Sequence, residues 1–459
     1  MADGYQKPKP GVVVEFEIEG LTDRGIGVGL YGDYRVSVRG PIPGDRVVAR
    51  IRKVFNRKKE CDAQVVDRIS ADIERVEPDC QHFGDCGGCL WQDLPYPNQL
   101  KLKEKLVLDT VCPRSEVAIG DALGAPQAYG YRNKMEFSFG EGKNGSVEVG
   151  LHPAGQFGQI FDLKQCSLVG SEVNEIVEVV RRFAKVERLS VYGLKTHTGL
   201  LRFLTIREGT GTGELMVVVT TSGEPFGAAE RLGRRLSEMF PRITSVVHTV
   251  NLEKAQVAFG SKSHVLFGNG SIRERLGPFE YEVSPQSFFQ PNVCQAERMF
   301  ERVISLCELT GHERALDAYC GTGSISLYLS QHAERVLGVE VSSAAIQDAV
   351  RNSARNRIEN TEFMVGPAED LLGQLRDQGE RFDVAVTDPP RAGMHHKALR
   401  DLIDLQPYRI LYVSCNPKAL ASDLKTFEAH GYQLNYLQLV DMLPQTPHCE
   451  VLAQLDRVK

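Results

Sequence analysis

The sequence predicts a multidomain α/β protein with an all-β segment first, a β-rich α+β segment in the middle and a doubly wound α/β segment last. Residues 11–70 alternate apolar and polar side chains between glycine-rich turns, as short antiparallel strands do. Residues 127–275 carry many further alternating strands, for example Leu215–Thr221. From Ser284 onward, strand patterns and helix patterns alternate, which is typical of βαβ units over a parallel sheet.

Length and composition support this division. A chain of 459 residues is too long for one core, and we divide it into residues 1–70, 71–280 and 281–459. The net charge of −6 excludes an overall field that attracts nucleic acid, so any RNA contact must come from local basic patches. The polar N-terminus and the absence of a long apolar run predict a cytoplasmic protein without membrane contact.

The first segment has the pattern of a small OB-like barrel. Short strands such as Val12–Ile18 and Tyr34–Val38 follow one another through glycine turns. A basic run interleaved with Phe55 consists of Arg50, Arg52, Lys53, Arg57, Lys58 and Lys59. Such a run is either an RNA-facing edge or a solvated hairpin rim, and the sequence supports both interpretations equally.

Three of the eleven cysteines form a cluster with the spacing C-x5-C-x2-C, at Cys80, Cys86 and Cys89. In a cytoplasmic chain, clustered cysteines indicate a metal site rather than disulfides. Three thiolates need a fourth ligand, and Cys166 is the best candidate. Four thiolates suit zinc or a 4Fe-4S cluster, and the spacing does not separate the two. The alternative is a reduced cysteine loop without metal.

A glycine turn at Gly321 and Gly323 follows a strand that begins at Arg314 and precedes a helix start at Ser324. Glycines let a ligand approach the backbone closely, as in Rossmann-like domains. Glu340 ends the next apolar strand about twenty residues later, where a carboxylate holds the two ribose hydroxyls of a nucleotide. The full phosphate-binding fingerprint is missing, so S-adenosylmethionine fits better than NAD, although both can be accommodated.

Cys415 decides between reaction classes. It follows the apolar run Ile410–Val413, and Asp388 follows Phe382–Val386, so both are expected at the carboxyl edge of a parallel sheet, where ligands bind. A thiolate there can add to C6 of a uracil and turn C5 into a nucleophile for a sulfonium methyl group. Asp388 can hydrogen-bond the uracil N3–H and orient the ring.

The methylated ring must then lose its C5 proton, which requires a base. Glu450 opens the last apolar strand, near the same sheet edge, and is the candidate. Each residue also has a simpler interpretation: Cys415 as a buried core thiol, Glu450 as a surface carboxylate and His448 as a packing or surface histidine.

The motifs C-x5-CGGC, DPPRAG and SCNP and the terminal Glu450 resemble, in this order, the RNA uracil-5-methyltransferase family over nearly the whole chain. The architecture is most similar to 23S rRNA uridine methyltransferases that carry a TRAM domain and a 4Fe-4S cluster. Relatives that methylate the tRNA T-loop uridine commonly lack one or both. Cytosine-5 methyltransferases usually carry their cysteine near the DPP motif, which has none here, and this favours uridine.

The resemblance implies roles for individual residues. It makes Cys415 the nucleophile, Glu450 the general base and Phe288 an aromatic that stacks on the extruded base. The residues implied in S-adenosylmethionine binding are Gln290, Tyr319, Glu340 and Asp388. The implied cluster ligands are Cys80, Cys86, Cys89 and Cys166. The chain departs from close relatives at Pro367 and Ala368, so no adenine contact is assigned there. A milder departure is Ser324, where some relatives have asparagine.

We therefore predict a monomeric, S-adenosylmethionine-dependent enzyme that forms 5-methyluridine in structured RNA, with 23S rRNA as the expected substrate. A tRNA T-loop uridine is the alternative substrate. The alternative of a different class is an RNA-binding, chaperone-like iron–sulfur protein with a vestigial site. The intact set of Cys415, Asp388 and Glu450 argues against it.

Overall fold

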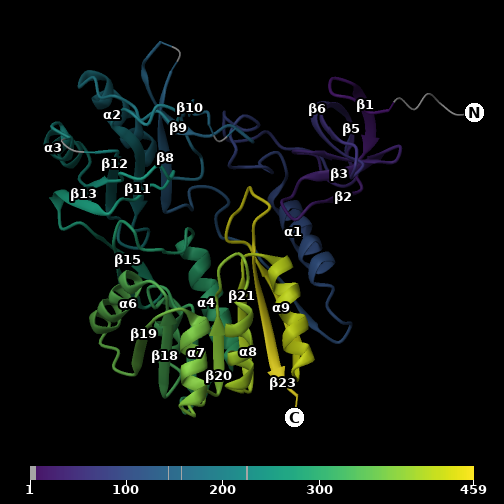
Figure 1. Ribbon diagram of the computed structural model, residues 1–459, viewed down its shortest axis with the longest axis vertical. Helices are drawn as coiled ribbons and strands as arrows, with labels where there is room; N and C mark the ends of the chain where they lie inside the picture. Colours follow the sequence, from purple (N-terminus) through teal and green to yellow (C-terminus); the bar gives the residue numbers. More distant parts are fainter. Residues whose placement is uncertain (1–6, 143, 157, 224–225, 459) are drawn as a thin grey trace, which may run out of the picture. The chain divides into compact units, whose positions relative to one another are not determined.

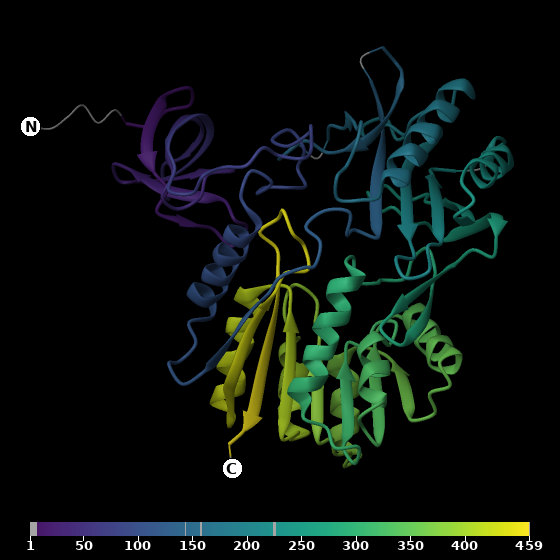
Figure 2. The same cartoon turned by 180° about the vertical axis from the view of Figure 1, so that it is seen from behind.

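The computed structural model describes residues 7–142, 144–156, 158–223 and 226–458 (Figures 1 and 2). The chain divides into two compact units. Unit 1 comprises Met1–Thr110 and Leu443–His448, and unit 2 comprises Val111–Met442 and Cys449–Lys459.

Unit 1 is built on a six-stranded sheet with the order β1-β5-β6-β4-β3-β2. Its elements are β1 (Val13–Glu17), β2 (Gly20–Leu21), β3 (Gly27–Tyr31), β4 (Tyr34–Val38), β5 (Arg46–Phe55), β6 (Glu60–Ser70) and α1 (Tyr96–Val111). Alternate residues of β1 and β4 are buried, because one face of the sheet packs on a core that includes Val36, Val47 and Ile51. The predicted strands are confirmed. No closed barrel is found among the described strands, so the OB-like barrel stays a prediction.

A second small core in unit 1 explains why the segment Leu443–His448 belongs there. The core contains Leu90, Trp91 and Leu94. The buried Gln99 amide donates to the carbonyls of Trp91 and Leu94 at 2.9 and 3.0 Å, and its oxygen accepts the Gln445 N–H at 2.9 Å. Gln445 is therefore anchored on α1 through a fully hydrogen-bonded buried amide.

Unit 2 contains a seven-stranded sheet with the order β10-β9-β8-β11-β12-β13-β14. Its elements, with the helices between them, are β8 (Lys134–Glu141), β9 (Val147–Leu151), β10 (Phe161–Asp162), α2 (Ser171–Val186), β11 (Leu201–Glu208), β12 (Leu215–Thr221), α3 (Ala229–Met239), β13 (Ile243–Val250) and β14 (Lys262–Gly268). Every residue of β12 is buried, as expected for a strand that is covered on both faces. A two-stranded hairpin, β15 (Ile272–Leu276) and β16 (Phe279–Val283), follows the sheet in the chain.

The largest sheet of unit 2 has eight strands in the order β19-β18-β17-β20-β21-β23-β22-β7. Its strands are β7 (Ala118–Leu123), β17 (Arg314–Ala318), β18 (Arg335–Glu340), β19 (Thr361–Val365), β20 (Val384–Thr387), β21 (Arg409–Ser414), β22 (Tyr432–Val440) and β23 (Glu450–Arg457). The strands from β19 to β21 run parallel, and β23 is antiparallel to both neighbours. The strand order reverses between β17 and β20, which is where such sheets bind ligands.

Helices cover both faces of this sheet. They are α4 (Val293–Cys307), α5 (Ser324–Ser330), α6 (Ser343–Arg355), α7 (Ala368–Asp377), α8 (His396–Asp404) and α9 (Pro417–Ala429). Figure 1 shows α7, α8 and α9 in front of the strands, and Figure 2 shows α4 on the opposite face. Among the described helices, none combines the length and apolar composition that a membrane span requires. The predicted doubly wound α/β arrangement is confirmed.

Candidate active site

The carboxyl ends of four neighbouring strands bring most of the predicted site residues together. In the pairing register Ala318 lies beside Thr387, and Thr387 lies beside Tyr412. Each strand is followed or ended by a predicted residue, and these residues are Tyr319, Glu340, Asp388 and Cys415. The sheet therefore places a tyrosine, two carboxylates and a thiol along one edge.

Cys415 and Glu450 are neighbours across two antiparallel strands. Ser414, the last residue of β21, pairs with Val451 of β23, so the next position places Cys415 opposite Glu450. The Oε2 atom of Glu450 is buried and has no hydrogen-bond partner among the described residues. Burial, followed by the charge of Asp388, raises the pKa of Glu450 well above its usual value.

The Cys415 thiol is half-buried and lies among acidic groups. Burial raises its pKa to about 11, and the nearby Glu450 and Asp388 act in the same direction, whereas Arg391 lowers it. The thiol is therefore protonated at neutral pH in the protein alone. A reactive thiolate therefore requires a change of these surroundings.

Asp388 is the third member of this group. Burial and the neighbouring Asp317 raise its pKa to about 7. Asp317 is fully buried on β17, its pKa is also raised to about 7 by burial, and the Ser326 hydroxyl donates to it at 2.6 Å. No role for Asp317 was predicted from the sequence. Burial of carboxyl groups side by side is typical of functional sites, because each charge disfavours the next.

One side chain joins the two loops that carry these groups. The Asn416 amide donates to the carbonyl of Arg391 at 2.8 Å, and its oxygen accepts the Lys418 N–H at 3.1 Å. Asn416 thus caps α9 and holds the DPPRAG loop against the SCNP loop. An asparagine directly before the helix-starting Pro417 is a sequence signal for this cap.

The glycine turn offers space for a nucleotide-like ligand. Gly321 has φ +55°, and a Cβ atom built there meets no atom within 4 Å, so the backbone is open to a ligand. The Glu340 carboxylate accepts the N–H groups of Gly321 at 3.2 Å and Ser342 at 2.8 Å. The Tyr319 side chain is largely buried, and burial raises the pKa of Tyr319 to about 12, whereas the backbone N–H of His395 acts in the opposite direction. An open turn beside a carboxylate and a tyrosine hydroxyl fits S-adenosylmethionine.

Phe288 and Gln290 lie on a separate loop before α4. The Phe288 side chain is 68% exposed, whereas Phe289 is buried against Tyr281 with ring centroids 5.3 Å apart. The backbone carbonyl of Gln290 accepts the Asn133 amide at 2.9 Å. Neither of these contacts involves Cys415, and the predicted roles of Phe288 and Gln290 stay predictions.

The cysteine cluster is spread over both units. Cys80, Cys86 and Cys89 belong to unit 1, where Arg39 donates to the carbonyls of Gly87 and Cys89 at 3.1 and 3.4 Å. Cys166 belongs to unit 2. In the part of the chain that the structure describes, no group of three or more potential ligands is arranged to hold a metal ion. The metal assignment of the four cysteines stays a prediction.

Comparison with known proteins supplies the family. The family model of tRNA (Uracil-5-)-methyltransferase matches residues 242–458. An uncharacterized RNA methyltransferase of Halalkalibacterium halodurans is 36% identical over 447 residues, covering 97% of each chain. One of Chlorobaculum tepidum is 36% identical over 460 residues, covering 96% of this chain and 93% of the relative. The crystal structure of Pyrococcus abyssi tRNA (uracil-54, C5)-methyltransferase in complex with S-adenosyl-L-homocysteine matches with a TM-score of 0.77 at 29% identity, covering 96% of this chain and 100% of that chain.

The doubly wound sheet and its glycine turn, together with these relatives, define an S-adenosylmethionine-dependent methyltransferase with a multi-sheet α/β fold. The chain belongs to the RNA uracil-5-methyltransferase family. The predicted enzyme class and fold are confirmed at this level.

Proposed function

We propose that the enzyme methylates C5 of a uridine in 23S rRNA and forms 5-methyluridine. The observation that carries the reaction is the position of Cys415: it directly follows β21, next to the Ser414–Val451 pair that Glu450 precedes on β23, and both Glu450 and Asp388 raise its pKa. A nucleophile and a base on one edge, with a carboxylate able to accept an N3–H, match the three needs of uracil C5 chemistry. The 23S substrate rests on the cysteine cluster and the N-terminal β segment, which resemble the rRNA-directed members.

Each residue has a defined task in this reaction. S-adenosylmethionine supplies an electrophilic methyl group. Asp388 accepts the N3–H of the uracil and orients the ring. The Cys415 thiol loses its proton to water, and the thiolate Sγ atom adds to C6, which places an electron pair on C5. C5 then takes the methyl group with release of S-adenosylhomocysteine. After C5 is methylated, Glu450 takes the C5 proton, the C5–C6 double bond forms again and the Sγ atom leaves. The raised pKa of Glu450 strengthens it as a base once it is ionised.

A uridine in the tRNA T-loop is the second candidate substrate. It is favoured by the Pyrococcus abyssi relative, a tRNA (uracil-54, C5)-methyltransferase that covers 96% of this chain. Both substrates use the same chemistry, so the choice depends on RNA recognition rather than on the site.

We also propose that the N-terminal sheet is an RNA-binding TRAM barrel and that Cys80, Cys86, Cys89 and Cys166 hold a 4Fe-4S cluster. Four thiols are a suitable donor set for iron–sulfur or zinc centres, and the positive Arg39 beside the loop compensates thiolate charge. We propose a monomeric, cytoplasmic protein divided at residues 70 and 280.

Nucleoside mass spectrometry tests the proposed function. The enzyme is incubated with S-adenosylmethionine and, separately, 23S rRNA or tRNA that lacks 5-methyluridine. A gain of 5-methyluridine in 23S rRNA alone is the expected result. A gain only in tRNA would select the second candidate, and no gain in either RNA would contradict uridine methylation.

A further inference from the structure

The loop that carries Phe288 and Gln290 is held by its backbone carbonyls. These are the carbonyls of Ser284, Ser287, Gln290 and Pro291. All four accept hydrogen bonds from two residues, Arg207 on β11 of the seven-stranded sheet and Asn133 directly before β8 of the same sheet. A backbone contact fixes the path of the loop whatever side chains it carries. The exposed Phe288 and its neighbour Gln290 therefore take their positions from a sheet outside the methyltransferase core.

Arg207, on β11, binds the loop through two side-chain hydrogen bonds. Its side chain is 3% exposed, and its guanidinium donates to the Ser284 carbonyl at 3.2 Å and to the Ser287 carbonyl directly before Phe288. Burial lowers the pKa of Arg207 to about 10, so it keeps its charge at neutral pH. The planar fork of donors is what allows one side chain to bind two carbonyls at once.

Asn133 holds the other end of the loop. Its amide donates to the Gln290 carbonyl at 2.9 Å, and its backbone N–H donates to the Pro291 carbonyl at 3.0 Å. The Asn133 carbonyl in turn accepts the N–H of Glu208, the residue after Arg207, at 2.8 Å. The backbone next to Arg207 is thus hydrogen-bonded to Asn133, and both residues are hydrogen-bonded to the loop.

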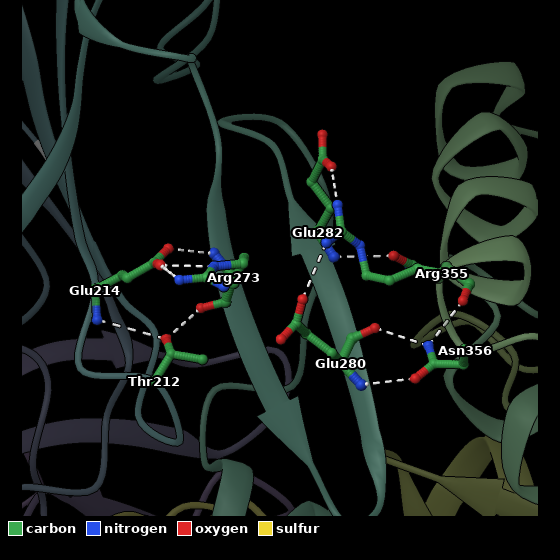
Figure 3. A network of polar contacts seen from close by, with 8 residues as sticks. Thr212, Glu214, Arg273, Glu280, Glu282, Arg355 and Asn356 are labelled. Atoms are coloured by element: carbon green, nitrogen blue, oxygen red, sulfur yellow. Dashed lines mark hydrogen bonds and ion pairs between the residues drawn. The ribbon is translucent and has the colours of Figure 1, made fainter.

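The opposite side of the loop is bound to the helix that follows the predicted ribose-binding strand. The Ser287 hydroxyl donates to Asp348 on α6. Further along α6, the Asn356 side chain hydrogen-bonds both the N–H and the carbonyl of Glu280 on β16, at 2.9 and 2.8 Å (Figure 3). Arg355 pairs with Glu280 and Glu282 in the same view. The loop is therefore bound on one side by α6, through Ser287 and Asp348, and on the other side by Arg207 and Asn133.

The first strand of the hairpin is also bound to the seven-stranded sheet. Arg273 on β15 pairs with Glu214 at 2.6 Å (Figure 3). A hollow of about 450 Å³ lies beside these pairs and is lined by Glu214, Arg273, Glu282 and Arg355 among others. Its arginines are already paired with carboxylates, which identifies a structural connection rather than an anion site.

We propose that Arg207 and Asn133 are positioning residues: Arg207 sets Phe288 against the extruded uridine, and Asn133 sets Gln290 against S-adenosylmethionine. The proposal deepens the proposed function and rests on it for the roles of Phe288 and Gln290. A displacement of about 1 Å in such a loop lowers the rate about 100-fold without removing any reacting group.

The test compares Arg207→Lys with a matched control, Arg202→Lys. Arg202 lies on the same strand, is also 3% exposed, and donates to the carbonyls of Asn251, Glu253 and Ala255, which belong to a different loop. A lysine cannot bind two carbonyls in a fork, so both variants should lose similar thermal stability. We expect kcat/KM for RNA to fall about 100-fold in Arg207→Lys and to stay within about twofold in Arg202→Lys. Equal losses in both variants, or none in Arg207→Lys, would overturn the proposal.

Asn133→Asp provides a readout that needs no turnover. The carboxylate keeps the shape of the side chain but cannot donate to the Gln290 carbonyl, so the Kd of S-adenosylmethionine measured by calorimetry should rise about tenfold. An unchanged Kd in a folded variant would remove the role of Asn133. If the unaltered enzyme makes no 5-methyluridine, the proposed function fails, and the calorimetric comparison still decides whether the loop is positioned for the cofactor.

Discussion

At the scale of single residues, the site is a group of acidic side chains, Asp388, Cys415 and Glu450, whose pKa values are all raised by burial. Burial first, and then the nearby carboxyl groups of Glu450 and Asp388, raise the pKa of the Cys415 thiol, and burial raises the pKa of the Glu450 carboxyl as well. This arrangement protects the thiol until a substrate arrives. Uridine entering between Asp388 and Cys415 would separate the charges and supply hydrogen bonds, so activation is expected to accompany substrate binding.

The first prediction concerns the nucleophile. Cys415→Ala removes the thiol next to Glu450 and should abolish methylation, because C5 stays a poor nucleophile without addition at C6. Tritium transfer from labelled S-adenosylmethionine to RNA measures this. Cys294→Ala, which alters an exposed thiol on α4, serves as the control and should retain activity. Residual turnover in Cys415→Ala would exclude the assignment.

The second prediction is a pH dependence. The thiolate fraction of Cys415 grows about tenfold per pH unit below its pKa of about 11, and Asp388 ionises above about 7. More thiolate at Cys415 and more carboxylate at Asp388 both favour the reaction, so kcat/KM for RNA should rise continuously from pH 6 to about 9. Initial rates at subsaturating RNA give the profile. A flat or falling profile would mean that neither group limits the reaction in the form described.

The sequence was sufficient to predict candidate reactive residues and insufficient to find the residues that hold the Phe288 loop. Cys415 and Glu450 stand in recognisable motifs, and the register of β21 and β23 places the two positions next to each other. Arg207 and Asn133 lie in no such motif, since they act on carbonyl groups 77 and 157 residues away in the chain. A backbone carbonyl is present at every position, so no residue pattern in the sequence shows which carbonyls accept these hydrogen bonds.

At the scale of elements, strand ends and helix caps place the site. The predicted strands Ile410–Val413 and Phe382–Val386 correspond to β21 and β20 with shifts of one or two residues. The pairing partner of a strand is harder to predict: β7 joins the far edge of the last sheet through parallel pairing with β22. Its short alternating pattern contains no information on which distant edge it joins, because pairing depends on which surfaces are left open.

The third prediction separates the two functions of Asn416. Asn416→Ala removes the α9 cap and the bond to Arg391, and should lower stability by about 1 kcal/mol, or Tm by about 2–4 °C. Asn416→Asp keeps the cap acceptor and loses only the donor to the Arg391 carbonyl, so it should keep Tm and lose activity. Thermal unfolding and methyl transfer are measured on both. Full activity in Asn416→Asp would show that the bond between the two loops is dispensable.

At the scale of the whole molecule, the cysteines are divided between two compact units. The resemblance to rRNA-directed enzymes predicts that Cys80, Cys86 and Cys89 share one cluster with Cys166.

The fourth prediction concerns that cluster. Protein purified without oxygen should be brown and contain about four iron and four sulfide atoms per chain, as a 4Fe-4S centre requires. Cys86→Ala should lose iron, whereas Cys294→Ala should keep it. Stoichiometric zinc in a colourless protein would replace iron–sulfur by a zinc site, and absence of both metals would leave the reduced cysteine loop.

The measurement that tests the central claim most directly is the identity of a trapped intermediate. Glu450→Gln cannot remove the C5 proton, so the enzyme should stop as a covalent complex with its RNA after the methyl group has been transferred. Nuclease and protease digestion followed by mass spectrometry should give a peptide whose Cys415 carries a 5-methylated uridine nucleotide. An unmodified Cys415 peptide, an adduct on another cysteine, or an adduct without the methyl group would contradict the account.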